Sequence, residues 1–447
     1  MHSNTSPEST RDFGAGERRG LVWLALVGFY AYFLTFFGAI DVHHTALFLL
    51  LVYLVVWAAR NWSDWKRSSL AWLLLAAFFY LVARYGYAYL AAEDDFSWNV
   101  EYGWPFLKLA GLFSFALVPF FSAGNGTKYL HRAFALIVIG LAIEIVRTLF
   151  IGDDARGLEH LDSGRPGFGM GPISFSMVSG FVIVGLVAFS DRFRRSAAAL
   201  APPLGLLAVA VVAVLLVLLF GGLILTQSVS NWAATAAALT ALLLLKLFGY
   251  GADGTPLHRM RYALIPALLV LIGIFLVSSQ WDLVNDRLKS KNLDPATLLA
   301  TDLADIPEKA LGARYHLYMV GASSIPDNPL FGVLPGGVEE RLSAARSRHS
   351  HVHNLPLQVM AGFGLAGFLL LAAFVAIAIR EVHRARADGL LPRDGAVFLL
   401  AAFVFFAVST LFDLSLKFRG TVALLGFVAA VPIALQIARL RLQRLTA

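Results

Sequence analysis

Three histidines and two arginines lie close together in the segment RSRHSHVHN, residues 346–354. An imidazole changes its charge near neutral pH, so a histidine in this segment is a candidate general base. Two other interpretations stay open. His349 and His353 would share one face of a helix and could form part of a metal site, although no HExxH motif or nearby carboxylate pair supplies further ligands. Alternatively, these histidines and His351 are solvated side chains at a membrane surface.

The residues that follow favour His353 as the catalytic histidine. His353 and Asn354 precede nine residues that lead to Gly364, and Gly367 follows about one helical turn later. Glycines at this spacing let another helix approach closely, which would fix the histidine at the end of its helix. Helix packing alone accounts for the glycines but not for the His-Asn pair. We therefore predict that His353 is catalytic, with His349, His351 and Asn354 as additional candidates.

Two arginines elsewhere in the chain are the predicted anion ligands. Arg314 lies on a predicted helix before the turn PDNPLFG, and Arg165 lies in the glycine-rich segment SGRPGFGMGP, whose backbone amides could approach a ligand. A guanidinium group stays charged and presents a planar fork of donors that suits phosphate oxygens. Two such groups beside a histidine could hold a diphosphate, whereas each alone is more often a solvated loop arginine. Arg348 is a further candidate.

Membrane-spanning helices are the elements that must position these residues. The chain has 447 residues, of which 58% are hydrophobic and 15% charged, and its mean hydropathy of +0.70 excludes an ordinary soluble domain. About 20 apolar residues cross a bilayer, and about twelve such runs occur. We predict an all-α integral membrane protein with spans at 21–40, 45–59, 69–90, 105–122, 129–151, 173–190, 201–225, 231–248, 262–279, 355–379, 395–412 and 420–438.

The basic residues indicate the orientation of these spans. Cytoplasmic loops carry an excess of Lys and Arg. More than half of the 36 Lys and Arg residues fall at the N-terminus, in alternate turns and in the C-terminal tail, whereas the acidic segment 91–104 on the opposite side has none. Both termini are therefore predicted to be cytoplasmic. The net charge of +7 follows from this orientation and gives no reason to expect nucleic-acid binding.

The segment between the ninth and tenth spans is the longest predicted loop, and the orientation places it outside the cytoplasm. Loops of this length are usually functional or disordered, and its helix-like stretches favour function. The predicted organisation is a cytoplasmic tail (1–20), nine spans (21–279), a periplasmic loop with the catalytic residues (280–354), three spans (355–438) and a cytoplasmic tail (439–447). The chain has no cysteine, which excludes thiol chemistry, and no GxxxxGK[ST] loop, which argues against an ATP-driven machine.

Several ionisable residues fall inside predicted spans, where insertion costs about 2.5–3.5 kcal/mol for each charge. Arg84 and Arg147 lie near the outer ends of their spans. They either reach the membrane surface with their long side chains or extend a positive cavity for an anionic lipid head group.

These residues resemble the bacterial O-antigen ligase family, which shares a signature region with O-antigen polymerases and protein O-oligosaccharyltransferases. The family's His-[Asn/Ser/Gln]-x9-Gly-x-x-Gly pattern falls on His353, Asn354, Gly364 and Gly367. Arg165 is similar to the family's arginine of an outer loop. The segment TQSVSNW, residues 226–232, is similar to its Thr-x-Ser-Arg-Gly segment but has Val229 where an arginine often stands, so no phosphate role is carried to it.

The resemblance implies a glycosyltransferase with a GT-C-like fold that needs neither a metal nor a cofactor. Such an enzyme moves O-antigen glycan from undecaprenyl diphosphate to a sugar hydroxyl of lipid A-core, within the bacterial inner membrane and facing the periplasm. His353 would be the general base, and Arg165 and Arg314 would stabilise the diphosphate as its charge grows. Direct attack would invert the anomeric centre.

Two other functions remain in competition with ligation. An O-antigen polymerase or protein O-oligosaccharyltransferase would use the same donor with another acceptor. A transporter of an anionic or lipid-linked substrate would line its path with the intramembrane Arg and Lys residues, but the repeated halves with broken helices that mark many transporters are not evident. The sequence assigns no role to Lys417 and Arg419, which fall in the last loop on the periplasmic side.

Overall fold

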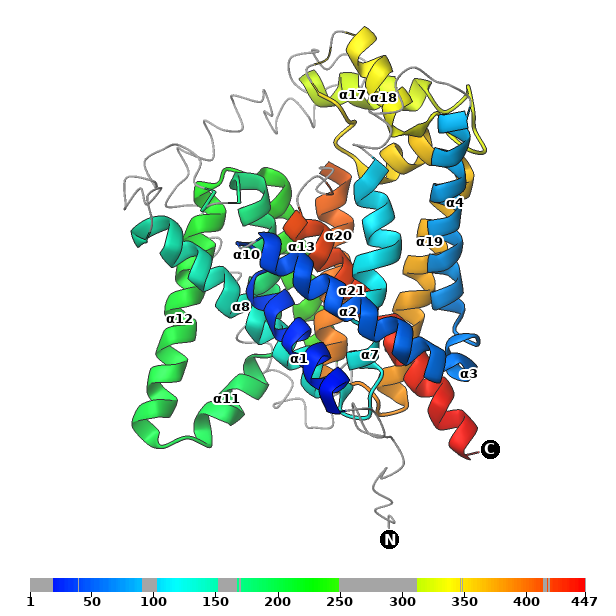
Figure 1. The fold of residues 1–447 in the computed structure, drawn as a ribbon. Coiled ribbons are helices and arrows are strands. Elements are labelled where there is room, and N and C mark those ends of the chain that lie inside the picture. The colour runs from blue at the N-terminus through cyan, green and yellow to red at the C-terminus, as the bar shows by residue number, and fades with distance from the viewer. Residues whose placement is uncertain are drawn as a thin grey trace.

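The computed structural model describes residues 19–38, 40–90, 103–151, 167–168, 170–248, 312–345, 347, 349–412, 416 and 419–446. All regular elements in these ranges are helical, which confirms the predicted all-α class for the described part of the chain (Figure 1).

Nine helical stretches within the described ranges are long and apolar enough to cross a membrane, or ten if one bent pair is counted as a single span. Their high hydropathy favours burial in lipid. No water is available there, so each backbone amide must bond within its own segment, as it does in a helix. The nine are α2 (Ile40–Arg60), α4 (Ser69–Leu90), a segment from Gly103 to Phe121, α8 (Gly126–Phe150), α12 (Pro202–Leu225), α13 (Val229–Leu247), α19 (Leu355–Ala387), α20 (Arg393–Phe412) and α21 (Arg419–Thr446).

Three of the twelve predicted spans differ from this set. The first, α1 (Arg19–Leu34), has 16 residues and is shorter than a bilayer crossing needs. The predicted span 173–190 is a bent pair, α10 (Pro172–Ala188) and α11 (Ser190–Ala198), with a 59° change of direction between the two helices. The predicted span 262–279 lies outside the described residues, as do residues 280–311 of the long loop that follows it. Apolar content identifies a helix, but it does not reveal where that helix bends.

The segment from Gly103 to Phe121 is less regular than its composition suggests. It contains a π-helix, η1 (Lys108–Phe113), followed by two short helices, α6 (Ser114–Ala116) and α7 (Val118–Phe121). Pro119 lies in α7 and cannot donate a backbone hydrogen bond, which helps to explain the break. The extra residue per turn of a π-helix also changes which side chains face the neighbouring helices.

The last helix, α21, is the most buried of the spanning helices in the described ranges, and Figure 1 shows it passing through the middle of the bundle. Its Phe427 ring lies 5.6 Å from the ring of Phe33 and 5.7 Å from that of Phe121. Aromatic pairs at these separations add to the stability gained by burial alone. At the far end of α21, Arg439 pairs with the buried Glu381 of α19.

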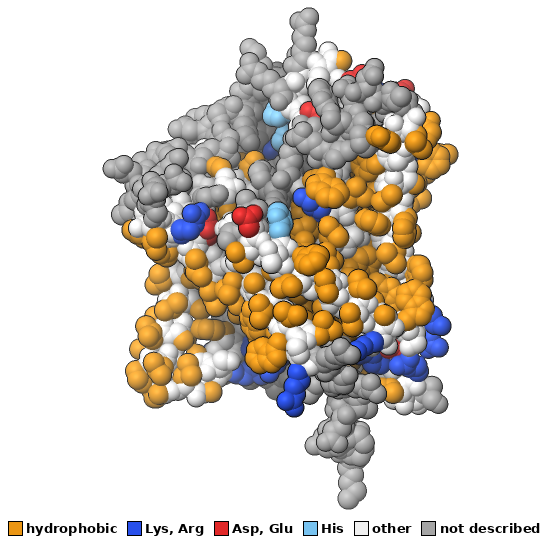
Figure 2. Space-filling view, viewed as in Figure 1, with side chains coloured by type: hydrophobic (Ala, Val, Ile, Leu, Met, Phe, Trp, Pro, Cys, Tyr) orange, Lys and Arg blue, Asp and Glu red, His pale blue; other side chains and the backbone are white. Residues whose placement is uncertain are grey.

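A band of hydrophobic side chains covers the face of the bundle seen in Figure 2, and Lys and Arg side chains gather along one edge of that band. The short α3 (Trp62–Trp65) lies at this edge, where its buried Asp64 pairs with Arg441 and Arg444 of α21. At the opposite end of the bundle lie α17 (Gly312–Ser323) and α18 (Leu334–Ala344) (Figure 1). We call residues 312–354 of the described ranges the end subdomain.

The end subdomain packs on the first turns of α19 through its own small core. This core consists of buried side chains from α17, α18, the loop before α19 and α19 itself: Leu317, Val338, Leu342, Val352 and Ala361. The histidine-carrying loop therefore lies between α17 and α18 of the end subdomain and α19 of the membrane bundle. Burial of these side chains fixes it in that position.

Candidate functional site

The three predicted histidines meet in the loop that connects α18 to α19. Nε2 of His353 lies 3.2 Å from Nδ1 of His349, and Nδ1 of His351 accepts a hydrogen bond of 3.2 Å from the backbone N–H of His353. The ring centroids of His351 and His353 are 4.0 Å apart. The sequence offered a shared helix face for His349 and His353 only as a condition of the metal-site interpretation. The segment is not helical, and the rings of His349 and His351 both lie against that of His353.

The backbone of His353 is held in an uncommon conformation. Its φ is 52°, in the left-handed region that side chains with a Cβ rarely adopt. Neighbouring contacts enforce it. Besides the bond to His351, the buried Gln358 accepts a hydrogen bond of 3.1 Å from the backbone N–H of Val352. Such strain is usually stored where the position of a side chain matters to function.

Asn354 supplies the start of α19. It is the N-cap residue, and its Oδ1 accepts a hydrogen bond of 2.9 Å from the backbone N–H of Leu357. Pro356 in the first turn has no N–H to satisfy, which completes a favourable helix start. The asparagine of the His-Asn pair therefore has a structural function in placing His353 directly before a rigid helix.

Burial differs among the three rings. His351 is 8% exposed, His353 is half-buried and His349 is exposed. The pKa of the His349 imidazole is lowered, first by partial burial and then by the nearby His353 and Arg314. His349 is therefore neutral to a lower pH than an ordinary histidine, and the positive charge of Arg314 on α17 contributes to this lowering.

Gly364, the first glycine of the predicted motif, has a different function from close helix packing. Gly364 interrupts α19 with a φ of 64°, and an added Cβ would lie 2.4 Å from backbone atoms of Leu330. The turn at residues 326–332 enters this break, where the N–H of Leu365 donates to the carbonyl of Pro329 at 2.8 Å and the N–H of Val333 donates to the carbonyl of Ala361 at 2.9 Å. A turn, and not a helix, therefore occupies the space at Gly364.

Helix α4 holds the same turn from the other side. Tyr80 donates a hydrogen bond of 2.6 Å to the carbonyl of Phe363, and Nη2 of Arg84 donates one of 2.8 Å to the carbonyl of Gly332. Arg84 thus donates a hydrogen bond to the backbone of the end subdomain. Its side chain holds two parts of the protein together and does not simply extend to the membrane surface. Sequence analysis missed Tyr80, although its place one helical turn before Arg84 was a signal.

The other predicted site residues either lie away from the histidines or fall outside the described residues. Arg147 pairs with the buried Glu144 on its own helix α8, at 2.6 Å, and α8 packs mainly against α1, α7 and α10. Arg165, Arg348 and Lys417 lie outside the described residues, and the side chain of Arg419 is also outside them.

The segment TQSVSNW contributes a buried polar network. Nδ2 of Asn231 donates a hydrogen bond of 2.6 Å to Oγ of Ser176 on α10, and Oγ of Ser409 on α20 donates one of 2.8 Å to Oδ1 of Asn231. Because Asn231 belongs to α13, one amide connects three helices. Sequence analysis did not identify this network, since its members are distant in the chain.

An apolar cavity of about 420 Å³ begins next to the histidine loop. Leu355 and Pro356, which directly follow Asn354, are part of its wall, and the cavity continues between α4, η1, α19, α20 and α21. Tyr80, Ser114 and Thr410 are the polar residues among an otherwise apolar lining. Such a cavity suits a hydrocarbon chain more than a polar ligand.

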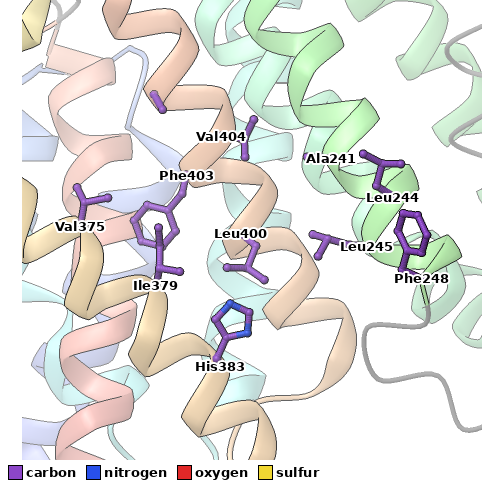
Figure 3. A pocket seen from close by; sticks show the side chains of 11 residues that line it. Ala241, Leu244, Leu245, Phe248, Val375, Ile379, His383, Leu400, Phe403 and Val404 are labelled. Carbon is purple, nitrogen blue, oxygen red and sulfur yellow. The ribbon is translucent and has the colours of Figure 1, made fainter.

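A second groove of about 580 Å³ lies between α13, α19 and α20, with Phe248, Phe403 and His383 among its walls (Figure 3). It shares Val375, Phe403 and Ala407 with the first cavity. His383 is its single polar lining residue and is 30 residues beyond His353. This groove therefore lacks the groups that chemistry needs and is not the candidate site.

The described residues contain no group of three or more His, Cys, Asp or Glu side chains that could hold a metal ion. The arrangement is instead suited to proton transfer beside a fixed positive charge.

The fold and the site together define a multi-pass helical membrane protein with a histidine and arginine site at one end of its bundle. Residues 214–372 match a family model described as O-Antigen ligase, so the chain carries an O-antigen ligase family domain over this range. The match includes Arg314, the three histidines, Gly364 and Gly367 and excludes Arg165. No curated protein matches the chain. The family implies an enzyme that ligates or polymerises lipid-linked glycans.

Proposed function

We propose that the protein is an O-antigen ligase that transfers glycan from undecaprenyl diphosphate to a sugar hydroxyl of lipid A-core. The observation that carries this proposal is the fixed position of His353, which is held in a strained backbone conformation two residues before Leu355 in the wall of an apolar cavity. The charge of Arg314 acts on the adjoining His349. A lipid-linked substrate needs a place for its hydrocarbon chain and a polar reaction centre at one end of it, and the two features adjoin here.

In this proposal His353 is the general base that takes the proton of the acceptor hydroxyl. The oxygen then attacks the anomeric carbon from the face opposite to the diphosphate, so the configuration inverts. Arg314 stabilises the negative charge that grows on the leaving diphosphate, because a guanidinium group remains cationic throughout the reaction. Arg165 is the predicted second ligand of the diphosphate. The leaving group is already activated, so neither a metal nor a nucleotide is required.

The charge distribution supports a periplasmic reaction centre. Lys and Arg side chains gather at the end of the bundle opposite to the end subdomain (Figures 1 and 2), and basic residues favour the cytoplasmic side. With both termini in the cytoplasm, the histidine cluster faces the periplasm from the inner membrane, where lipid A-core would reach it.

The test is glycan transfer by the purified protein, given the lipid-linked donor and lipid A-core in the presence of EDTA and without nucleotide. His353→Asn is the preferred variant, because asparagine tolerates a positive φ better than alanine does. We expect it to lose roughly 100-fold or more of the wild-type rate, the usual contribution of a general base. His383→Ala, at the far groove, is the matched control and should retain activity.

Each alternative gives a different result. Product formed on a second lipid-linked glycan, but not on lipid A-core, would assign a polymerase, and product formed on a peptide would assign a protein O-oligosaccharyltransferase. Equal rates for wild type and a folded His353→Asn variant would refute the role of His353. No transfer to any acceptor, together with uptake of the lipid-linked substrate into vesicles, would indicate a transporter.

A further inference from the structure

We propose that the turn at residues 326–332 inserts into the bilayer, with the side chains of Leu330 and Phe331 among the lipid chains of the leaflet nearest the end subdomain. The partner of this surface is the membrane itself. The proposal gives the end subdomain a membrane contact of its own. It does not depend on the proposed function, because it concerns a different surface from the histidine loop.

The turn presents its largest apolar side chains outward. Leu330 and Phe331 are 56% and 47% exposed. The backbone of the same turn is pressed against α19: Gly332 is buried, and a Cβ added to it would lie 2.4 Å from the carbonyl carbon of Gly362. The fold therefore fixes the outward direction of the two side chains. Two adjacent large apolar side chains held in this way gain free energy only if an apolar environment covers them.

The turn lies beside a part of α4 that is within the membrane span. Arg84 donates a hydrogen bond to the carbonyl of Gly332, and the hydroxyl of Tyr80 lies 3.3 Å from the carbonyl oxygen of Phe331. Helix α4 ends at Leu90, so at 1.5 Å per residue Arg84 is about 9 Å and Tyr80 about 15 Å inside that end. The turn therefore reaches the depth at which α4 crosses the bilayer.

Exposed apolar side chains continue on both sides of the turn. On α4, Phe79 and Val82 are 62% and 44% exposed, and on α19, Leu365 and Leu369 are 40% and 55% exposed. The two helices lie side by side (Figure 1), and the N–H of Leu365 donates to the carbonyl of Pro329 in the turn. Contiguous exposed apolar surface of this kind marks contact with a membrane or another protein. We call this surface the apolar patch: Phe79, Val82, Leu330, Phe331, Leu365 and Leu369.

The backbone of the turn has the hydrogen bonds that insertion into lipid requires. Irregular backbone is tolerated at membrane depth only where the protein supplies partners for its polar groups. Each carbonyl from position 328 to position 332 has a donor within 3.3 Å. In the order of the carbonyls, the donors are the N–H groups of Gly332, Leu365 and Ala366, the hydroxyl of Tyr80 and Nη2 of Arg84.

The N–H groups of the turn follow the same pattern. Phe331 donates to Oδ1 of Asn328 and Gly332 donates to the carbonyl of Asn328, while Pro329 has no N–H. A turn in water needs no such set of internal partners, because water supplies them. The full set of carbonyl partners therefore favours lipid as the surroundings of the turn.

The position of charge along the turn indicates how it enters the membrane. Asp327 pairs with Arg341 of α18, and the two side chains are 56% and 37% exposed. Residues 328–333 contain no charged side chain. Charge is costly in hydrocarbon, so this arrangement places the ion pair at the level of the lipid head groups and the tip of the turn below it.

Site-directed spin labelling measures the insertion, and the absence of cysteine from the chain gives each variant a single reactive thiol. Leu330→Cys and Phe331→Cys each receive a nitroxide label in the full-length protein, held in lipid nanodiscs. Oxygen is concentrated in the bilayer and a water-soluble nickel chelate is excluded from it, so their relative access to the label reports depth. Val82→Cys on α4 is the lipid control. Glu340→Cys, at an exposed charged position of α18, is the water control.

We expect labels at positions 330 and 331 to resemble the label at position 82, with more access to oxygen than to the nickel chelate. The label at position 340 should show the opposite preference. Access to nickel at 330 and 331 equal to that at 340 would overturn the proposal. Low access to both reagents would show that a protein surface, such as a second copy of this chain, covers the apolar patch, and would overturn it as well.

A second measurement compares two substitutions of the same side chain. Leu330→Ala and Leu330→Asp remove the same apolar contacts, but only the second places a carboxylate in the lipid. We expect Leu330→Asp to exchange the amide hydrogens of Gly332 and Leu365 roughly 10-fold faster than Leu330→Ala does in nanodiscs, because the charge drives the turn out of its seat. Equal exchange in the two variants would place the turn in water. Neither measurement uses glycan transfer, so failure of the proposed function would leave both results unaffected.

Discussion

His353 and Gly364 both have left-handed backbone conformations, but for different reasons. His353 has a φ of 52° and is held there by contacts of its neighbours, whereas Gly364 has a φ of 64° at the break of α19. Glycine adopts this conformation without strain, and a side chain does not. The strain at His353 is therefore maintained by the contacts around it, whereas Gly364 admits the turn at residues 326–332 without strain.

Comparing alanine substitutions at Gly364 and Gly389 separates the cost of backbone strain from the cost of a steric clash. An added Cβ at Gly364 would meet the backbone of Leu330 at 2.4 Å, whereas one at Gly389, which also has a positive φ of 74°, would meet nothing within 4 Å. We expect Gly389→Ala to lower the free energy of unfolding by about 1 kcal/mol, from strain alone. Gly364→Ala should cost about 3 kcal/mol or more, since backbone atoms must also move.

Thermal unfolding of the two variants in the same detergent provides the measurement. A similar loss of stability in both would show that the turn is not tightly seated against Gly364. That outcome would contradict the view that the break in α19 helps to position the histidine loop.

At the level of single residues, sequence reasoning found the groups with distinctive chemistry but not their partners. His353 and Arg314 were identifiable from residue type and from the glycines that follow. Gln358 and Tyr80 were not, because their contacts depend on how distant segments meet: Tyr80 bonds to a carbonyl at position 363. The convergence of all three histidines was also missed, because residue spacing in a loop does not show which rings meet.

Among the elements, α4 is the one that couples the membrane bundle to the histidine loop. Its Tyr80 donates to the carbonyl of Phe363, directly before the break in α19, and its Arg84 donates to the carbonyl of Gly332 in the turn that enters the break. A carbonyl left unsatisfied by the loss of one donor costs about 1–3 kcal/mol. The bundle therefore holds the end subdomain by hydrogen bonds as well as by apolar packing.

We accordingly expect Tyr80→Phe to destabilise the protein by about 1–3 kcal/mol and to increase hydrogen exchange at residues 328–366. Tyr87→Phe on the same helix is the matched control, because the Tyr87 side chain is 64% exposed and its loss of a hydroxyl should change neither quantity. Equal exchange of residues 328–366 in both variants would mean that α4 does not hold the turn.

The spanning elements show what hydropathy can predict. The span predicted at 69–90 coincides with α4, Ser69–Leu90. Its neighbour 105–122 was placed correctly but contains a π-helix that composition did not reveal. The bend between α10 and α11 was missed for a physical reason: α11 is polar and was assigned to a turn, although it continues as a helix on the bundle surface.

For the molecule as a whole, the distribution of charge indicates which side of the membrane the histidine loop faces. The end with α11 and the C-terminus of α21 carries ion pairs between Arg192 and Asp394 and between Arg439 and Glu381, whereas the opposite end carries the histidine loop. If basic residues set the orientation, the histidines face the periplasm. This inference needs a test of its own, because the fold is compatible with either orientation.

The absence of cysteine from the chain makes that test direct, since any introduced thiol is the single reactive one. Ser323 on α17 and Ser196 on α11 are both exposed and lie at opposite ends of the bundle. We expect a membrane-impermeant maleimide to label Ser323→Cys in intact spheroplasts, and to label Ser196→Cys only after the membrane is permeabilised. The reverse pattern would place His353 in the cytoplasm, away from a periplasmic acceptor, and would exclude ligation to lipid A-core on that side whatever the chemistry of the histidines.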